Sequence, residues 1–186
     1  KMNANSFKGT ALFGDSDPDN TGITSAGTTD QFIARFKGGY YLISSNNTTR
    51  VGVQLLSGQN SWSAISDSTK KENKLPIDEE GLLKKISNFK LTSWNYKGQD
   101  PKTFRHYGPM AQDFFNAFGH DAMGVIGCDT LINQQDFLGI NFTAIHALEK
   151  RTQKISELQT ELDTLKKENA AMRKELDEIK KLLMNK

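Results

Sequence analysis

The chain has 186 residues, of which 36% are hydrophobic and 25% charged, and its net charge is +2. This length fits one or two small domains, and 15 glycines with 4 prolines exclude collagen-like and proline-rich chains. The nearly balanced charge gives no electrostatic case for a nucleic-acid or membrane-surface partner, and no apolar run approaches a membrane span. The only cysteine, Cys128, cannot form an internal disulfide, and no zinc-site spacing occurs, so we expect no metal and no cofactor. The opening Lys1-Met2 indicates a fragment of a larger protein.

Residues 1–65 are rich in Gly, Ser, Thr and Asn, which is typical of short strands and turns. Residues 31–45 predict two short strands flanking the turn at Gly38-Gly39, and residues 50–55 predict a third. The apolar content is too thin for an independent core, and such a segment usually gains buried surface from neighbouring copies of itself. The alternative is a loop-rich β domain within one chain.

The sequence pattern of residues 66–136 predicts a small α+β unit. Pro76 and the acidic residues 78–80 predict a helix start, and residues 90–96 predict a strand. His106-Tyr107-Gly108 fits a strand or a turn. Residues 109–118 predict a short helix, with Pro109 at its first position and Gly119 after its end.

From residue 155 onward, apolar residues recur at alternating steps of three and four. Such a narrow stripe fits a coiled-coil seam better than the face of a globular-domain helix. Extending the register upstream puts Arg151 at a d position, so the coil is expected to begin near that residue. Apolar residues between 138 and 148 predict a helix that packs on the globular unit. The predicted a and d positions are Ile155, Leu158, Leu162, Leu165, Asn169, Met172, Leu176, Ile179 and Leu183.

The residues flanking this seam favour a parallel assembly. Each acidic g position precedes a basic e position by five residues, so a parallel in-register assembly pairs opposite charges whereas an antiparallel one pairs like charges. Asn169 at an a position disfavours slipped registers, because a shift places its amide against leucine. The seam does not decide between two and three strands, and a solvated single helix is the alternative. The pairs are Glu161 with Lys166, Glu168 with Arg173, and Glu175 with Lys180.

Few residues suggest enzyme chemistry. There is no phosphate loop, nucleophile elbow or zinc-protease motif, and the three histidines are widely separated. Ser66 and Lys71 form a Ser-Lys dyad if the intervening chain folds back, with a neutral lysine amine accepting the hydroxyl proton. Burial would make the lysine a base, because a lysine in water, whose pKa is about 10.4, stays protonated at neutral pH. The alternative is ordinary turn or helix-cap chemistry.

Together these features resemble the C-terminal intramolecular chaperone auto-processing domain, the peptidase S74 family of phage tail spikes, tail fibres and endosialidases. The resemblance also extends to related trimeric proteins of the myelin regulatory factor type. It covers about residues 30–186. Its landmarks are Phe32-x-Ala34-Arg35-x-x-Gly38-Gly39-Tyr40, Ser66-Asp67-x-x-x-Lys71-Glu72-Asn73, Trp94-Asn95-Tyr96-Lys97, His106-Tyr107-Gly108-Pro109-Met110-Ala111-Gln112-Asp113-Phe114 and Gly139-Ile140-Asn141-x-x-Ala144-Ile145.

The resemblance implies a parallel homotrimer that registers an upstream β-structured stalk and then cuts itself free. It makes Ser66 the nucleophile and Lys71 the general base. The expected cleavage site is the Ile65–Ser66 bond, with the bond on the other side of Ser66 as the alternative. Lys70 is a rival base one residue away. The carboxylates of Asp67 and Glu72 are candidates for holding either ammonium protonated, which would slow cleavage. The dyad is expected to form only when the trimer is complete.

We therefore predict an α+β protein in three parts. These are the end of a β-rich trimeric stalk at 1–65, an α+β auto-processing chaperone domain at 66–147, and a parallel trimeric coiled coil at 148–186. The resemblance places the protein in a phage tail spike or fibre precursor made in the host cytoplasm, with the chaperone part shed. A trimeric end-piece that never cuts is the alternative, and a zipper-type DNA binder is disfavoured because residues 137–148 are apolar rather than basic.

Overall fold

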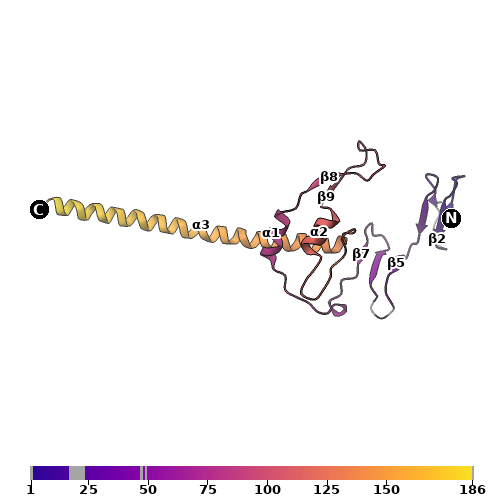
Figure 1. The fold of residues 1–186 in the computed structure, drawn as a ribbon, viewed down its shortest axis with the longest axis horizontal. Helices are drawn as coiled ribbons and strands as arrows, with labels where there is room; N and C mark the ends of the chain where they lie inside the picture. The colour runs from indigo at the N-terminus through magenta and orange to yellow at the C-terminus, as the bar shows by residue number, and fades with distance from the viewer. Residues whose placement is uncertain (1, 17–23, 47, 49, 186) are drawn as a thin grey trace. The chain divides into compact units, whose positions relative to one another are not determined.

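The computed structural model describes residues 2–16, 24–46, 48 and 50–185. The chain forms two compact units, Lys1–Lys74 and Leu75–Lys186 (Figure 1). The three-part division into stalk, chaperone domain and coil stays a prediction.

The strands among the described residues of the first unit are short and form small sheets. Two of these sheets are parallel pairs, β1 with β3 and β2 with β4, and the third is an antiparallel meander of β5, β6 and β7. Two-stranded sheets of this size are marginally stable alone in water. The strands are β1 (Met2–Asn3), β2 (Ala11–Gly14), β3 (Thr24–Ser25), β4 (Phe32–Arg35), β5 (Gly39–Ile43), β6 (Gly52–Leu56) and β7 (Ser63–Ala64).

The two strands predicted around Gly38-Gly39 both form, but they belong to different sheets. β4 pairs in parallel with β2, whereas β5 pairs with β6, the strand predicted at residues 50–55. Gly39 has φ +89°, and a Cβ there would lie 2.2 Å from the Leu55 carbonyl oxygen. Only glycine therefore allows β5 to start so close to β6.

The first unit has almost no core. Among its described residues, Ala26 is the one buried apolar side chain, at 4% exposure. Large apolar side chains remain in water instead, including Phe32 at 69% exposure and Trp62 at 51%. An apolar groove lies between the strands, lined by Phe13, Phe32, Ala34, Phe36, Tyr40, Leu42, Leu55 and Trp62. The prediction that this stretch lacks an independent core is confirmed.

The second unit is α+β, as predicted. α1 (Glu79–Ser87) begins where Asp78 caps the amide of Gly81 at 2.9 Å, and β8 (Thr92–Trp94) pairs antiparallel with β9 (His106–Gly108). α2 (Ala111–Phe118) is followed by α3 (Gln134–Met184), a single helix of 51 residues.

Two details of the sequence prediction are wrong. The strand expected over residues 90–96 is confined to β8, because residues 96–99 close a turn in which the Gln99 amide donates to the Tyr96 carbonyl at 3.1 Å. The short helix begins at Ala111 rather than Pro109, since Met110 is still extended with ψ 148°. Gly119 follows the end of α2 as expected.

α1 packs against the first part of α3, α2 touches the same helix through an aromatic pair, and the small core of this unit lies among these three helices. Ala144 and Ala147 are buried on α3, and their small side chains allow Leu82 of α1 to be buried as well. Phe114 of α2 lies with its ring centroid 6.0 Å from that of Phe137 on α3. The helix upstream of residue 148 does pack on the globular unit, but most of the apolar residues expected to pack there are exposed. These are Leu138, Phe142, Ile145 and Leu148, at 50% exposure or more, whereas Ala144 is buried.

Ion pairs hold the N-terminal end of α1 against α3. Glu79 lies 3.0 Å from both Lys150 Nζ and His146 Nδ1, and Glu80 binds the guanidinium of Arg151 through two of its nitrogens. The hydrogen bond from Lys150 holds the pKa of Glu79 below its usual range, and that from Arg151 does the same for the pKa of Glu80. Arg151, the charged residue at a seam position, is thereby engaged within its own chain.

Replacing Leu82 with alanine tests the α1–α3 packing. Because the side chain is 8% exposed, we expect Leu82→Ala to lower the free energy of unfolding by about 2 kcal/mol or more. Denaturant titration followed by circular dichroism measures this change. Leu91→Ala is the matched control, since Leu91 is 74% exposed and its loss should be nearly neutral. Equal effects of the two substitutions would contradict the packing.

The ion pairs predict a pH dependence. Since the pKa values of Glu79 and Glu80 are lowered in the folded state, their stabilisation is present above the usual glutamate pKa of about 4.3 and is lost as the pH falls through the lowered values. A Glu79→Gln, Glu80→Gln variant should melt below the wild type at neutral pH, and the difference should vanish in acid. Glu178→Gln, at an exposed carboxylate, should show no such difference. A gap that persists unchanged in acid contradicts this prediction.

Candidate functional site

The predicted cleavage site lies directly after β7, in the first unit. The amide of Ile65 donates to the Gly52 carbonyl of β6 at 3.2 Å, which ties the bond's N-terminal side to the sheet. Residues Ser68–Lys70 form a single 3₁₀ turn, η1, on its C-terminal side. The Ile65–Ser66 bond therefore lies between two locally held segments.

The turn brings Ser66 and Lys71 together. Lys71 Nζ donates to Ser66 Oγ at 2.7 Å, a distance at which a proton can pass between amine and hydroxyl. The side chain of the rival base, Lys70, makes no hydrogen bond or ion pair with any described residue. The geometry therefore favours Lys71 over Lys70 as the partner of Ser66.

The neighbouring carboxylates do not occupy Lys71. Asp67 accepts from the Thr69 amide at 2.9 Å and from the Thr69 hydroxyl at 2.8 Å, and Glu72 forms no ion pair with a described residue. The hydrogen bond from the Thr69 amide, followed by that from its hydroxyl, holds the pKa of Asp67 below its usual value. Neither carboxylate therefore pairs directly with Lys71 in the single chain, and the expectation that they hold either ammonium protonated stays a prediction.

Ser66 and Lys71 are both exposed in the single chain. The hydrogen bond between them is present within one chain, and the expectation that the working dyad forms only in a completed trimer stays a prediction. An ammonium in water is a poor base, because hydration favours its charged form. The single chain thus supplies the geometry of a Ser-Lys dyad without the burial that its chemistry needs.

Aromatic rings gather around the β8–β9 hairpin of the second unit. The rings of Trp94 and His106 stack with centroids 4.7 Å apart, and Tyr96 packs edge-on against both. Arg105 supports the hairpin through hydrogen bonds to Asn95 Oδ1 at 2.9 Å and Ser93 Oγ at 2.7 Å. These signature residues therefore hold one another, and His106 has an aromatic setting rather than a nucleophile beside it.

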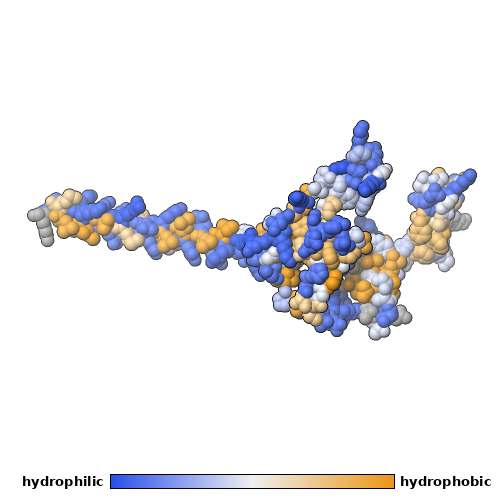
Figure 2. Space-filling model, viewed as in Figure 1, coloured by the Kyte–Doolittle hydropathy of each residue, from blue (hydrophilic) through white to orange (hydrophobic). Residues whose placement is uncertain are grey.

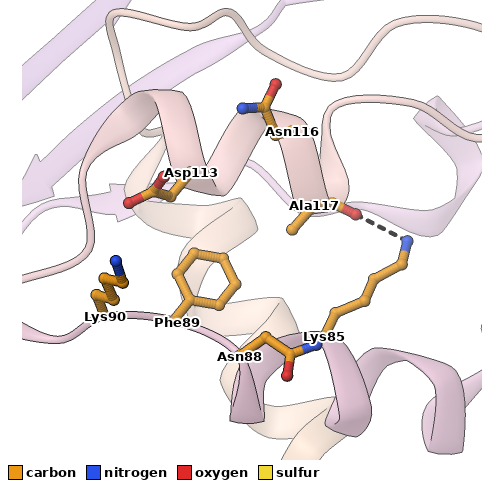
Figure 3. A pocket seen from close by; sticks show the side chains of 7 residues that line it. All are labelled: Lys85, Asn88, Phe89, Lys90, Asp113, Asn116 and Ala117. Atoms are coloured by element: carbon orange, nitrogen blue, oxygen red, sulfur yellow. Dashed lines mark hydrogen bonds between the residues drawn. The ribbon is translucent and has the colours of Figure 1, made fainter.

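A surface groove lies between the end of α1 and α2 (Figure 3). Lys85 reaches across from α1 and donates to the Ala117 carbonyl of α2 at 2.7 Å. Phe89 lines the groove and its ring stacks on that of Phe118, with centroids 5.7 Å apart. A lysine on one of the last carbonyls of a helix satisfies an otherwise free acceptor, so Lys85 ties α1 to α2 across this groove.

The seam of α3 is exposed along its whole predicted length. The apolar a and d residues range from 45% exposure at Leu162 to 69% at Leu183, and Figure 2 shows apolar patches along the helix between hydrophilic ones. Asn169 is also exposed, and its amide donates to the Leu165 carbonyl at 3.1 Å. The structure therefore places every predicted seam residue on one long helix without a partner within the described part of the chain.

Two general features bear on the class of site. Within the described ranges, no three side chains of His, Cys, Asp or Glu gather as they would around a metal ion. Nor does any helix among the described residues combine the length and apolarity that crossing a membrane requires.

Comparison with known proteins gives a family match for one segment of this chain. No curated protein matches the sequence. Residues 66–121 match the Peptidase_S74 family model, described as chaperone of endosialidase, which confirms the resemblance over this segment. The landmarks predicted around residues 32–40 and 139–145 lie outside the matched residues. The matched segment begins at Ser66 itself and runs through Lys71, α1, the β8–β9 hairpin and α2. Through residues 66–121 the chain is similar to the Peptidase_S74 chaperone family.

Proposed function

We propose that this chain is an intramolecular chaperone that assembles as a parallel homotrimer, sets the register of an upstream β-structured fibre or spike, and then releases itself. Release occurs by cleavage of the Ile65–Ser66 bond, with Ser66 as nucleophile and Lys71 as general base. The observation that carries this proposal is the 2.7 Å contact between Lys71 Nζ and Ser66 Oγ at the start of the family-matched segment.

In the proposed reaction, neutral Lys71 accepts the Ser66 hydroxyl proton while Oγ attacks the carbonyl carbon of Ile65. The carbon–nitrogen bond to Ser66 then breaks, and Lys71 returns the proton to the leaving amine. Water hydrolyses the resulting ester, which leaves a carboxylate on Ile65 and restores the serine hydroxyl. Each chain therefore cuts once.

Assembly supplies the burial that the single chain lacks. Because the pair already has its geometry, neighbouring subunits need only exclude water from Lys71 to favour its neutral form. Cleavage would then follow assembly rather than precede it. This order lets scission report that the trimer is complete.

The exposed seam of α3 supports the trimer. Leaving a stripe of apolar side chains in water is unfavourable, and side-by-side association of identical helices buries it at once. The g-position carboxylates Glu168 and Glu175 form no ion pair with a described residue of their own chain. They thus remain available for Arg173 and Lys180 of a parallel neighbour.

The small buried core of the first unit supports the templating role. Short strands whose described residues bury only the side chain of Ala26 gain little from folding alone, and finding partners in register is entropically costly. A coil joined to them raises their effective concentration and fixes their stagger. After release, unfolded stalk chains would lack the means to reassemble, so the product is kinetically trapped. The family description points to a phage tail protein as the passenger.

A non-cleaving trimeric end-piece is the second candidate. The exposure of Ser66 and Lys71 favours it, because a dyad that stays in water does not react. It shares the seam and the stalk with the first candidate. Only cleavage separates the two.

Substitution at the dyad tests the cleavage. We expect Ser66→Ala and Lys71→Ala each to abolish cutting, because the first removes the nucleophile and the second the base. Intact-mass measurement of freshly folded protein should show a fragment beginning at Ser66 in the wild type and only full-length chains in these variants.

Lys70→Ala is the matched control, since it removes a neighbouring lysine that does not contact Ser66. It should cut as the wild type does. Unabated cutting in Ser66→Ala would eliminate Ser66 as nucleophile, and loss of cutting in Lys70→Ala but not in Lys71→Ala would transfer the base to Lys70.

Cysteine cross-linking tests the orientation of the coil. In a Cys128→Ser background, Leu183→Cys places a thiol at an a position near the end of α3. Parallel chains should form a disulfide there on mild oxidation, and sedimentation should give three chain masses. Lys181→Cys, on the outer face of the same turn, should remain reduced. A monomer, or no cross-link at residue 183, contradicts the parallel trimer.

A further inference from the structure

Ser66 and Lys71 are five positions apart in the sequence, and an extended chain over that separation spans about 17 Å. The 2.7 Å contact therefore depends on a chain reversal, which η1 provides. Two backbone hydrogen bonds close the reversal, from the Lys70 amide to Asp67 at 3.1 Å and from the Lys71 amide to Ser68 at 3.3 Å.

Little else holds this turn. A single 3₁₀ turn has poorer hydrogen-bond geometry than an α-helix, and no residue of η1 is buried. The remaining restraint is the Asp67 carboxylate, whose Oδ1 accepts from both the amide and the hydroxyl of Thr69. A side chain that satisfies a free amide at the start of a turn stabilises that turn.

We propose that Asp67 is a positioning residue for the self-cleavage, acting by capping η1 so that Lys71 is held against Ser66. This inference rests on the proposed function. Asp67 does not touch the reacting atoms, and it acts through Thr69 and the turn. In this account its negative charge is incidental.

The rival role for Asp67 is electrostatic, in which its charge favours the ammonium form of Lys71. The two roles differ in what asparagine does. Asn keeps an acceptor oxygen and caps as well as Asp, but it carries no charge. A capping role predicts that Asp67→Asn cuts at nearly the wild-type rate with an unchanged pH midpoint. A charge role predicts a midpoint shifted to lower pH.

The experiment follows cleavage of the full chain after cell-free synthesis, chased over a pH series from weakly acid to weakly alkaline. We expect Asp67→Ala to cut about fivefold more slowly, the usual effect of losing a cap, and Asp67→Asn to restore the rate. Thr69→Val keeps the amide but loses the hydroxyl, and should slow cutting by about half as much on a logarithmic scale.

Asp100→Ala is the matched control. Asp100 Oδ1 accepts from the Lys102 amide at 2.9 Å, the same local contact as that between Asp67 and Thr69, but in the loop between β8 and β9. It should cut at the wild-type rate. Whether each variant assembles is measured separately, in a Ser66→Ala background that cannot cut. Cleavage rates are then compared only among variants that form trimers.

The inference is overturned if Asp67→Ala trimers cut at the wild-type rate, or if Asp67→Asn cuts as slowly as Asp67→Ala or shifts the pH midpoint. If Asp67→Ala fails to assemble, Thr69→Val decides, and an unchanged rate in its trimers overturns the inference. These results leave the proposed function standing. By contrast, cleavage of the Ser66→Ala variant itself would contradict the proposed function.

Discussion

The main physical constraint on this chain is the apolar surface that it leaves exposed to water. α3 carries a seam of apolar side chains that are 45% exposed or more, and the described part of the first unit buries only Ala26. Exposure of apolar side chains to water is unfavourable in the α3 seam and in the first unit alike. Association with identical chains is the simplest way to bury the two surfaces together. The same constraint that makes the chain incomplete alone gives it a reason to assemble.

Burial also links assembly to chemistry. The contact between Ser66 and Lys71 requires only six residues and one capped turn, so it forms without help from elsewhere. A lysine amine acts as a base only where water is excluded, and the single chain leaves this lysine exposed. In this account the Ser66–Lys71 contact forms first and Lys71 becomes a base only on burial. Cleavage that follows folding requires this order.

Much of this was predictable because the signals are local. The heptads of α3, the start of α1 at Asp78 and the Ser66–Lys71 spacing all depend on residues close in sequence. The pairing of β4 with β2 was not predictable, since strand partners are chosen by long-range packing. Nor was the contact of Asp67 with Thr69, because the sequence shows a carboxylate a few residues before two lysines but not that Thr69 binds it. The ion pair of Arg151 with Glu80 likewise joins residues 71 positions apart.

The dependence of cleavage on protein concentration tests the central claim most directly. Freshly synthesised chains are diluted in steps, and the rate of appearance of the fragment beginning at Ser66 is measured together with the trimer fraction. If burial on assembly activates the dyad, the rate should fall on dilution in proportion to the trimer population. Cleavage at one constant rate in dilute monomers would contradict the account.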